Sequence, residues 1–179
     1  GAVLTSGLHL DGLADWADSF GGRTPERRLS IMKDSSIGAY GVIALAVVLL
    51  AKWLAVGRIL ASGGWTWIAA SPVISRATLV FLAALQPYAR AEGGTGHPFV
   101  TEANRRRAAG TMAVALVLLL MMLRPGIGLA VSTGGALLMT WIFGTWCRRR
   151  VGGVTGDLLG ACGEWVELWV LLCGGTLLS

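Results

Sequence analysis

The chain alternates between long apolar stretches and short polar links, which is the pattern of a protein that crosses a membrane several times. Most of the stretches are close to the roughly 20 residues that an α-helix needs to span the hydrocarbon core of a bilayer. They cover residues 41–60, 65–85, 108–123, 126–147 and 155–178, of which the third is the shortest. The pattern predicts an all-α fold, a polytopic integral membrane helical bundle of about five transmembrane helices forming a single domain.

Composition supports a membrane protein. Of the 179 residues, 54% are hydrophobic and only 14% are charged, and the mean hydropathy is +0.66, whereas soluble domains carry about 25% charged residues. A soluble core of this size could not easily bury so many apolar residues on all sides of its helices. We therefore expect the lipid bilayer as a partner and no nucleic acid, and a homo-oligomer stays open.

The basic residues gather in alternate links. They are Arg23, Arg27, Arg28 and Lys33 before the first stretch, Arg90 and Arg105–Arg107 in the link 86–107, and Arg148–Arg150 before the last stretch. The other two links carry no charge or Arg124 alone. The positive-inside rule then places residues 1–40, 86–107 and 148–153 on the cytoplasmic side of the cell inner (plasma) membrane. Attraction to anionic lipid would explain the arginine triplets equally well, but it does not explain the carboxylates.

The N-terminal segment GLHLDGLADWADSF, residues 7–20, carries three aspartates at helical spacing. On a helix, Asp11, Asp15 and Asp18 fall within about 40° of one another. Three like charges in one stripe repel, and a hard cation such as Mg²⁺ among them would relieve the repulsion. The alternative is a solvated acidic face. We expect an Asp-bearing N-terminal helix that binds Mg²⁺.

A second acidic group lies in GGVTGDLLGACGEWVEL, residues 152–168. Asp157 and Glu164 are seven residues apart and share a helix face, along which Gly160 leaves room for a neighbouring helix or a ligand. Ionisable residues inside membrane helices are costly and are functional candidates for that reason. Because Asp157 follows the basic link, it should lie level with the N-terminal aspartates, so that both acidic groups meet on one face.

Cationic side chains near these carboxylates suit a phosphorylated substrate. The basic residues of 23–33 and the arginine triplet at 105–107 could bind phosphate oxygens in two-pronged fashion. A metal-type aspartate stripe beside them indicates a phosphate or pyrophosphate whose charge is neutralised as a bond breaks. His9 precedes the stripe and could act as a base, although a lone histidine is more often a structural hydrogen-bonding group.

Five motifs in order resemble the cobalamin synthase (adenosylcobinamide-GDP ribazoletransferase) family. They are GLHLDGLADWAD at 7–18, RRLSIMKDSSIGAYG at 27–41, SRAT at 75–78, YARAEG at 88–93 and GGVTGDLLGACGEWVEL at 152–168. The resemblance implies that residues 1–179 form one membrane-embedded transferase domain. It implies a reaction that joins adenosylcobinamide-GDP and α-ribazole, or its 5′-phosphate, to give adenosylcobalamin or its 5′-phosphate and GMP, the last assembly step of cobalamin biosynthesis.

The resemblance also implies Mg²⁺ and residue roles. The implied catalytic residues are Asp11, Asp15 and Asp157, and the implied metal ligands are Asp11, Asp15, Asp18, Asp34 and Asp157. Substrate contacts are expected from His9, Arg28, Lys33, Arg76, Arg90 and Glu164. Two departures stand out. Ser36 occupies a position where the family usually carries arginine, and the family usually has another hydrophobic segment before the HLDG motif, so an upstream segment is expected to be missing.

Two other functions remain as alternatives. An ion-coupled transporter would spread its charges through the membrane depth and show inverted repeats, whereas the main charged clusters here gather at one face and no internal repeat is evident. A CDP-alcohol-type membrane phosphotransferase would share the Mg²⁺ and the Asp-rich helix. Its usual DG-x2-AR pattern is absent, since Leu13-Ala14-Asp15 follows Asp11-Gly12.

Overall fold

The computed structural model describes residues 7–94 and 96–177, and these residues form helices joined by short links. The elements are α1 (Leu8–Asp18), the 3-10 turn η1 (Ser19–Gly21), α2 (Pro25–Ile31), α3 (Ala39–Ala61), α4 (Thr66–Leu85), α5 (His97–Glu102), α6 (Arg105–Met122), α7 (Ile127–Val151) and α8 (Gly156–Leu177). Within the described ranges the extended structure is a single isolated bridge between Tyr88 and Val154. The all-α prediction is confirmed.

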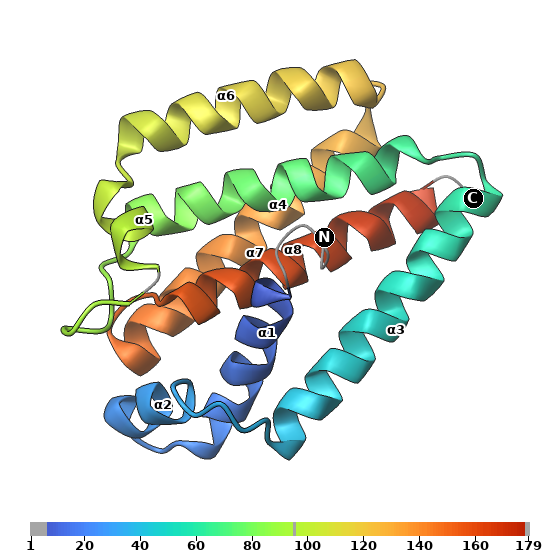
Figure 1. Cartoon of the computed structure of the whole chain (residues 1–179). Helices are drawn as coiled ribbons and strands as arrows, with labels where there is room; N and C mark the ends of the chain where they lie inside the picture. The colour runs from blue at the N-terminus through green and yellow to red at the C-terminus, as the bar shows by residue number, and fades with distance from the viewer. Residues whose placement is uncertain (1–6, 95, 178–179) are drawn as a thin grey trace.

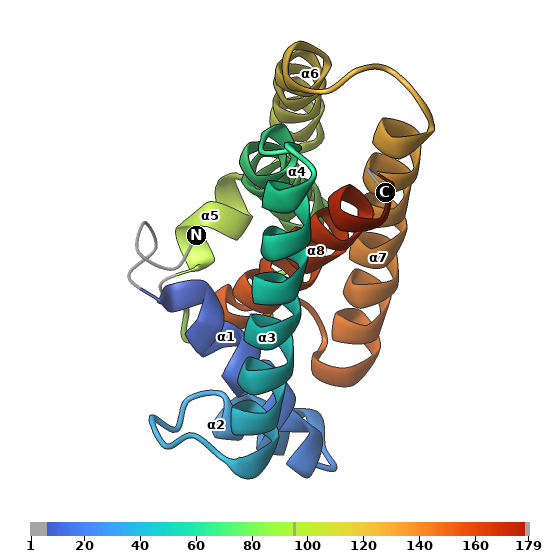
Figure 2. The same cartoon turned by 90° about the vertical axis from the view of Figure 1, so that its right-hand side faces the viewer.

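Four helices, α3, α4, α7 and α8, are long and apolar enough to cross a membrane. The third predicted span, residues 108–123, is helical as part of α6, but this helix is only 18 residues long and begins with three arginines. Those charges explain why α6 does not qualify as a span by length and composition. The chain is thus a polytopic membrane protein with four clear candidate spans, and α6 lies beside α4 (Figures 1 and 2).

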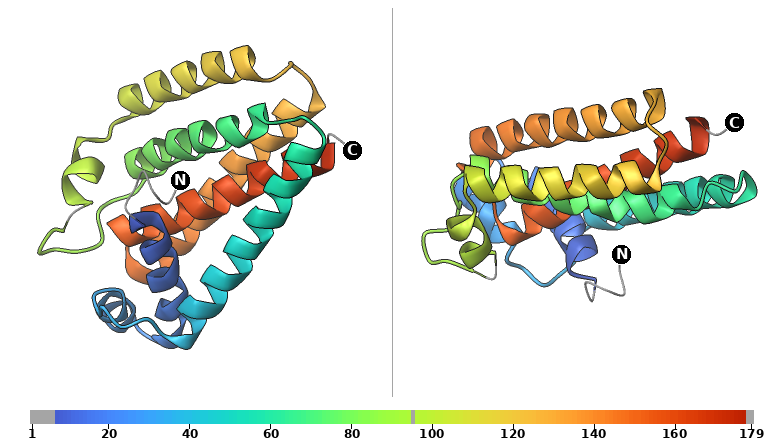
Figure 3. Two further views of the ribbon diagram at one scale, coloured as in Figure 1. Left: turned by 45° about the vertical axis from the view of Figure 1, so that its right-hand side comes forward. Right: turned by 90° about the horizontal axis from the view of Figure 1, so that it is seen from above.

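The long helices alternate in direction, so the links fall at two ends of the bundle. Figure 1 shows α2, α5 and the link between α7 and α8 toward one end. The turn between α3 and α4 and the link between α6 and α7 lie at the other end, as Figure 3 shows from two further sides. The basic links predicted to share a membrane face therefore lie at the same end of the molecule, with the Asp-bearing helix α1 leading toward it.

Helix α8 is the central element of the bundle. In its most apolar 18-residue window 78% of the residues are buried, against 17% in α3, whose outer side carries exposed apolar side chains such as Trp53. It packs against α1, α3, α4 and α7. The acidic motif predicted to carry chemistry is therefore placed in the core of the protein, where an unpaired charge would be costly.

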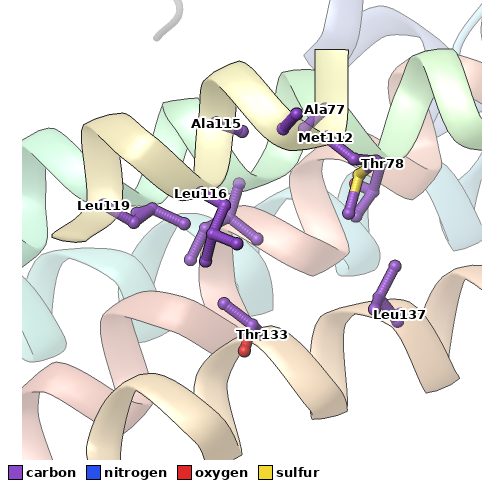
Figure 4. Close-up of a pocket in the computed structure, with 10 residues that line it drawn as sticks. Ala77, Thr78, Met112, Ala115, Leu116, Leu119, Thr133 and Leu137 are labelled. Atoms are coloured by element: carbon purple, nitrogen blue, oxygen red, sulfur yellow. The ribbon is translucent and has the colours of Figure 1, made fainter. Parts of the chain in front are cut away.

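Figure 4 shows an apolar pocket of about 330 Å³ between α4, α6 and α7. Its only polar lining side chains are Thr78 and Thr133, and both hydroxyls donate within their own helices, to the carbonyl oxygens of Ser75 and Leu129. The pocket offers no free polar group that could orient or activate a substrate. It does not contain the predicted chemistry, which lies on the other side of the bundle where α1 crosses α8.

Candidate active site

Glycines bring the two acidic motifs together where α1 crosses α8. A Cβ atom on Gly12 would lie 2.5 Å from the backbone oxygen of Asp157 and 2.9 Å from its Cα. On the opposite helix, a Cβ atom on Gly160 would lie 3.0 Å from the Cα of His9. Side chains at either glycine would force the helices apart. The HLDG and TGDLLG motifs therefore have a packing role, which is to let the backbones of α1 and α8 touch beside Asp157.

The link after α4 delivers Arg90 to the same place. The amide of Ala89 donates to the oxygen of Val154 at 2.9 Å, and the amide of Val154 donates to the oxygen of Pro87 at 2.9 Å. These bonds tie the link to the start of α8. Arg90 then donates from Nη2 to Oδ2 of Asp157 at 2.7 Å and to the backbone oxygen of Met32 at 3.3 Å. Both ion-pair partners are largely buried, with side chains 11% and 19% exposed.

Asp15 is the carboxylate with the most perturbed ionisation at this crossing. Burial, followed by the negative charges of Asp157 and Asp11, raises its pKa from the usual 3.8 to about 7, and Arg90 only partly offsets them. Near neutral pH, Asp15 is therefore close to half-protonated, which suits a group that accepts or releases a proton. The crossing collects more negative charge than Arg90 compensates, so a bound cation would be stabilised there.

The five predicted metal ligands do not form one compact cage. Asp18 accepts hydrogen bonds from the backbone amides of Gly38 at 2.7 Å and Gly41 at 2.9 Å. Asp34 is exposed and accepts a bond from the amide of Ser36, which lowers its pKa. Asp11 is exposed and lines an open pocket of about 580 Å³ on α1. Among the described residues, no three Asp, Glu, His or Cys side chains are close enough to hold an ion by themselves.

Two of the predicted phosphate-binding cations already have partners. Arg28 is buried, and its Nη1 donates to the backbone oxygen of Ser19 at 3.0 Å, while the guanidinium lies 5.8 Å from the ring centre of Phe20 and 5.9 Å from that of Trp146. It therefore braces the turn after α1. Lys33 forms an exposed ion pair with Glu92, which links the segment after α2 to the segment that carries Arg90.

A second charged cluster lies deeper, between the middles of the long helices. The ammonium of Lys52 contacts Oε2 of Glu164 at 2.6 Å and Oε2 of Glu167 at 2.7 Å, and Arg76 lies 3.6 Å from Oε1 of Glu167. His9 approaches the same cluster, where burial and the charge of Arg76 lower its pKa. Its buried Nδ1 has no hydrogen-bond partner among the described residues. Arg76, Glu164 and His9 thus lie together, apart from the Asp15 and Asp157 pair.

Three residues of these two clusters were not among the predicted site residues. Lys52 and Glu167 carry charges inside apolar stretches, and the cost of burying a lone charge was a signal that each needed a partner. Tyr88 belongs to the YARAEG motif, and its hydroxyl is buried beside Gly94, where a Cβ atom would lie 2.6 Å from it. Only the fold shows that Tyr88, in the link after α4, lies near the ion pair of Arg90 and Asp157.

Comparison with known proteins gives a consistent result. Residues 1–175 match the family model described as cobalamin-5-phosphate synthase. A relative from Chlorobium phaeobacteroides named adenosylcobinamide-GDP ribazoletransferase is 43% identical over 180 residues, covering 97% of this chain and 71% of the relative. One of the same name from Syntrophobacter fumaroxidans is 44% identical over 174 residues, covering 95% and 68%. No solved structure matches the chain.

Proposed function

Because the chain belongs to the cobalamin-5-phosphate synthase family, we propose that it acts as an adenosylcobinamide-GDP ribazoletransferase. A ribose hydroxyl of α-ribazole, or of its 5′-phosphate, attacks the phosphorus that carries cobinamide in adenosylcobinamide-GDP. A new phosphorus–oxygen bond forms, the bond to the GMP oxygen breaks, and the hydroxyl proton passes to a base. The products are GMP and adenosylcobalamin or its 5′-phosphate.

The observation that carries this proposal is the meeting of Asp15, Asp157 and Arg90 where α1 crosses α8. The carboxylates of Asp15 and Asp157 gather negative charge where a cation bound with the substrate phosphate would be stabilised. The guanidinium of Arg90 is held in place by the backbone pairing of its link. Its N–H groups that do not bond Asp157 can donate to phosphate oxygens. Carboxylates that can hold a cation and a guanidinium that can donate to phosphate oxygens, side by side, are what this transfer requires.

The residues at the crossing fit Mg²⁺ bound with substrate. This ion is usually held by one or two carboxylates together with substrate phosphates and water, so a three-carboxylate cage is not needed. Asp15 and Asp157 would hold it, with the exposed Asp11 beside them. The unrelieved negative charge that raises the pKa of Asp15 supports this assignment. A bound Mg²⁺ would neutralise charge on the phosphate oxygens during the transfer.

The second cluster suits the rest of the substrate. Glu164 lies seven residues beyond Asp157 on α8, which is about 10 Å along a helix. Within residues 7–94 and 96–177, Arg76 has one carboxylate at 3.6 Å and the hydroxyl of Ser75 at 3.1 Å as partners, so several of its five donors remain for a ligand. His9 and Glu164 lie beside it. Lys33, whose partner Glu92 lies two residues after Arg90, would meet the departing GMP.

The decisive experiment is a GMP-release assay on purified, full-length protein in detergent, with adenosylcobinamide-GDP and α-ribazole. We expect GMP and cobalamin to form in equal amounts, to require Mg²⁺, and to fall at least about 100-fold, or about 2.7 kcal/mol of barrier, in Asp157→Asn. Glu102→Gln, on the exposed helix α5, is the matched control and should keep its activity. If protein that has been verified to be folded releases no GMP with all components present, the assignment is wrong.

We also propose that the end carrying α2 and α5 faces the cytoplasm of the inner membrane. The arginine triplets at 105–107 and 148–150 support this orientation. Because the native cysteines are buried, single cysteines introduced at Ser36 and Ser62 can report it. An impermeant thiol reagent added to spheroplasts should label Ser62→Cys and not Ser36→Cys. The reverse labelling would place the site on the outer side.

A further inference from the structure

Asp18 differs from its neighbours on α1 because its carboxylate is turned toward another helix. We propose that Asp18 is a positioning residue that fixes the start of α3 to the end of α1, and that it does not contact the metal ion or the substrate. The proposal deepens the proposed function and rests on it. It also changes the role that the i, i+4, i+7 spacing of the three aspartates predicted for Asp18.

Both carboxylate oxygens of Asp18 are bonded to the first turn of α3. Oδ2 accepts from the amide of Gly38 at 2.7 Å, and Oδ1 accepts from the amide of Gly41 at 2.9 Å. The first amides of a helix have no partner within the helix, and a negative charge there is stabilised by the helix dipole. The cap residue Gly38 has no side chain to supply a partner. Asp18 therefore caps α3 from a different helix.

The two glycines leave the space that this contact needs. A Cβ atom on Gly41 would lie 2.5 Å from Oδ2 of Asp18, and a Cβ atom on Gly38 would lie closer still to Oδ1. Neither glycine is required by its backbone conformation, because Gly38 is extended and Gly41 is helical. Their small size serves close approach alone. The glycines of the SSIGAYG sequence and Asp18 thus form one latch, defined here as Asp18, Gly38 and Gly41.

The latch controls where the reacting carboxylates lie. Helix α3 is one of the candidate membrane spans, whereas α1 is a short helix of 11 residues that crosses α8. The latch holds the last residue of α1 against the start of α3, while Gly12 holds the middle of α1 against Asp157. Asp15 lies between these two fixed points. Asp157 and Asp11 influence the ionisation of Asp15 more strongly than Asp18 does, which agrees with Asp18 being turned away from the crossing.

Two substitutions disturb the latch in different ways. Asp18→Asn keeps the size of the side chain but offers an amide nitrogen to one backbone amide, so one of the two bonds is lost. Gly41→Ala keeps the carboxylate of Asp18 and pushes it away from α3. Asp15→Asn removes a proposed metal ligand and leaves the latch intact. Gly57→Ala, on the same helix α3 with open space around it, is the control.

The test combines three measurements: the rate of GMP release against Mg²⁺ concentration, Mn²⁺ binding in the presence of adenosylcobinamide-GDP followed by electron paramagnetic resonance, and hydrogen exchange at residues 38–42. Asp18→Asn and Gly41→Ala should each lower kcat at least about 10-fold and speed exchange, while half-saturation by Mg²⁺ and binding of Mn²⁺ change less than about 2-fold. Asp15→Asn should weaken metal binding at least about 10-fold without changing exchange at these amides.

Two results would overturn the proposal. One is a weakening of Mn²⁺ binding by 10-fold or more in Asp18→Asn while Gly41→Ala binds normally, which would make Asp18 a metal ligand. The other is unchanged exchange and unchanged turnover in both latch variants, which would remove its positioning role. If the wild-type protein releases no GMP, the proposed function fails, but exchange and Mn²⁺ binding still decide the role of Asp18.

Discussion

Arg90 and Asp157 form an ion pair at 2.7 Å between the link after α4 and the first turn of α8. Arg90 does not depend on this pair for its place, because the backbone bonds between its link and Val154 hold it there. The buried Nε of Arg90 has no recorded partner in the described part of the chain. The guanidinium is therefore both fixed and incompletely used, which suits a group that binds an anion when substrate arrives.

Arg90→Lys should separate charge from geometry at this position. Lysine keeps the positive charge near Asp157 but cannot bridge a carboxylate and a phosphate with a planar fork. We expect KM for adenosylcobinamide-GDP to rise about 10-fold, with a smaller change in KM for α-ribazole. Steady-state kinetics of GMP release measures both constants. Arg124→Lys, at an exposed position in the link between α6 and α7, is the control, and equal effects of the two substitutions would count against a specific role of Arg90.

The repulsion at the crossing should make stability depend on pH through Asp15. Its folded pKa of about 7 lies above the usual 3.8, so its stabilising contribution is full below about pH 4 and is lost as pH rises through 7. Asp15→Asn removes this loss. With EDTA present, the melting temperature of the wild-type protein should fall relative to that of the variant between about pH 4 and pH 7. The same scan with Mg²⁺ should reduce the difference, and parallel curves without Mg²⁺ would contradict the assignment.

The sequence predicted the helices and the membrane character because both depend on local patterns. Apolar stretches of span length and arginines in alternate links located the long helices and put the basic links at one end. The third span, residues 108–123, was the exception, since Arg105–Arg107 lie inside the helix and not before it. In physical terms, a run of hydrophobic residues does not show where the helix around it begins.

The site was harder to predict because its geometry depends on contacts between distant segments. Helical spacing placed Asp11, Asp15 and Asp18 on one face, but it could not show that Asp18 bonds the start of α3. Likewise Lys52 and Glu167 were visible as isolated charges, and their pairing depends on the packing of α3 against α8. Individual residue types were informative, whereas their partners followed only from the fold.

The deep cluster should tolerate complete neutralisation better than the loss of one member. Lys52→Met would leave the buried carboxylates of Glu164 and Glu167 beside each other without their shared cation, and breaking a buried pair costs about 3–5 kcal/mol. The triple variant Lys52→Met, Glu164→Gln, Glu167→Gln should recover most of this stability. Denaturant unfolding in mixed micelles measures both effects.

A control on the same helix makes this measurement specific. Arg58→Met removes an exposed cation from the last turn of α3 and should change the free energy of unfolding by less than about 0.5 kcal/mol. If Lys52→Met were as mild as Arg58→Met, the three charges would not act as a buried unit. If the triple variant stayed as unstable as Lys52→Met, packing of the lysine side chain would be the cause and the charge would not.

Gly12→Ala should separate the crossing of α1 and α8 from the chemistry of the carboxylates. The added methyl group would lie 2.5 Å from the oxygen of Asp157 and 3.0 Å from its carbonyl carbon, and backbone atoms in the central helix cannot move aside cheaply. Helix α1 must shift, which displaces Asp15 from Asp157 although every carboxylate and cation is still present. Since a misplacement of about 1 Å can cost roughly 100-fold in rate, we expect GMP release to fall by about that factor.

Gly110→Ala, in α6 with nothing within 4 Å of the new atom, should keep full activity. Activity in Gly12→Ala equal to that of Gly110→Ala would mean that the contact between α1 and α8 does not set the geometry of the site, and that Asp15 and Asp157 act independently.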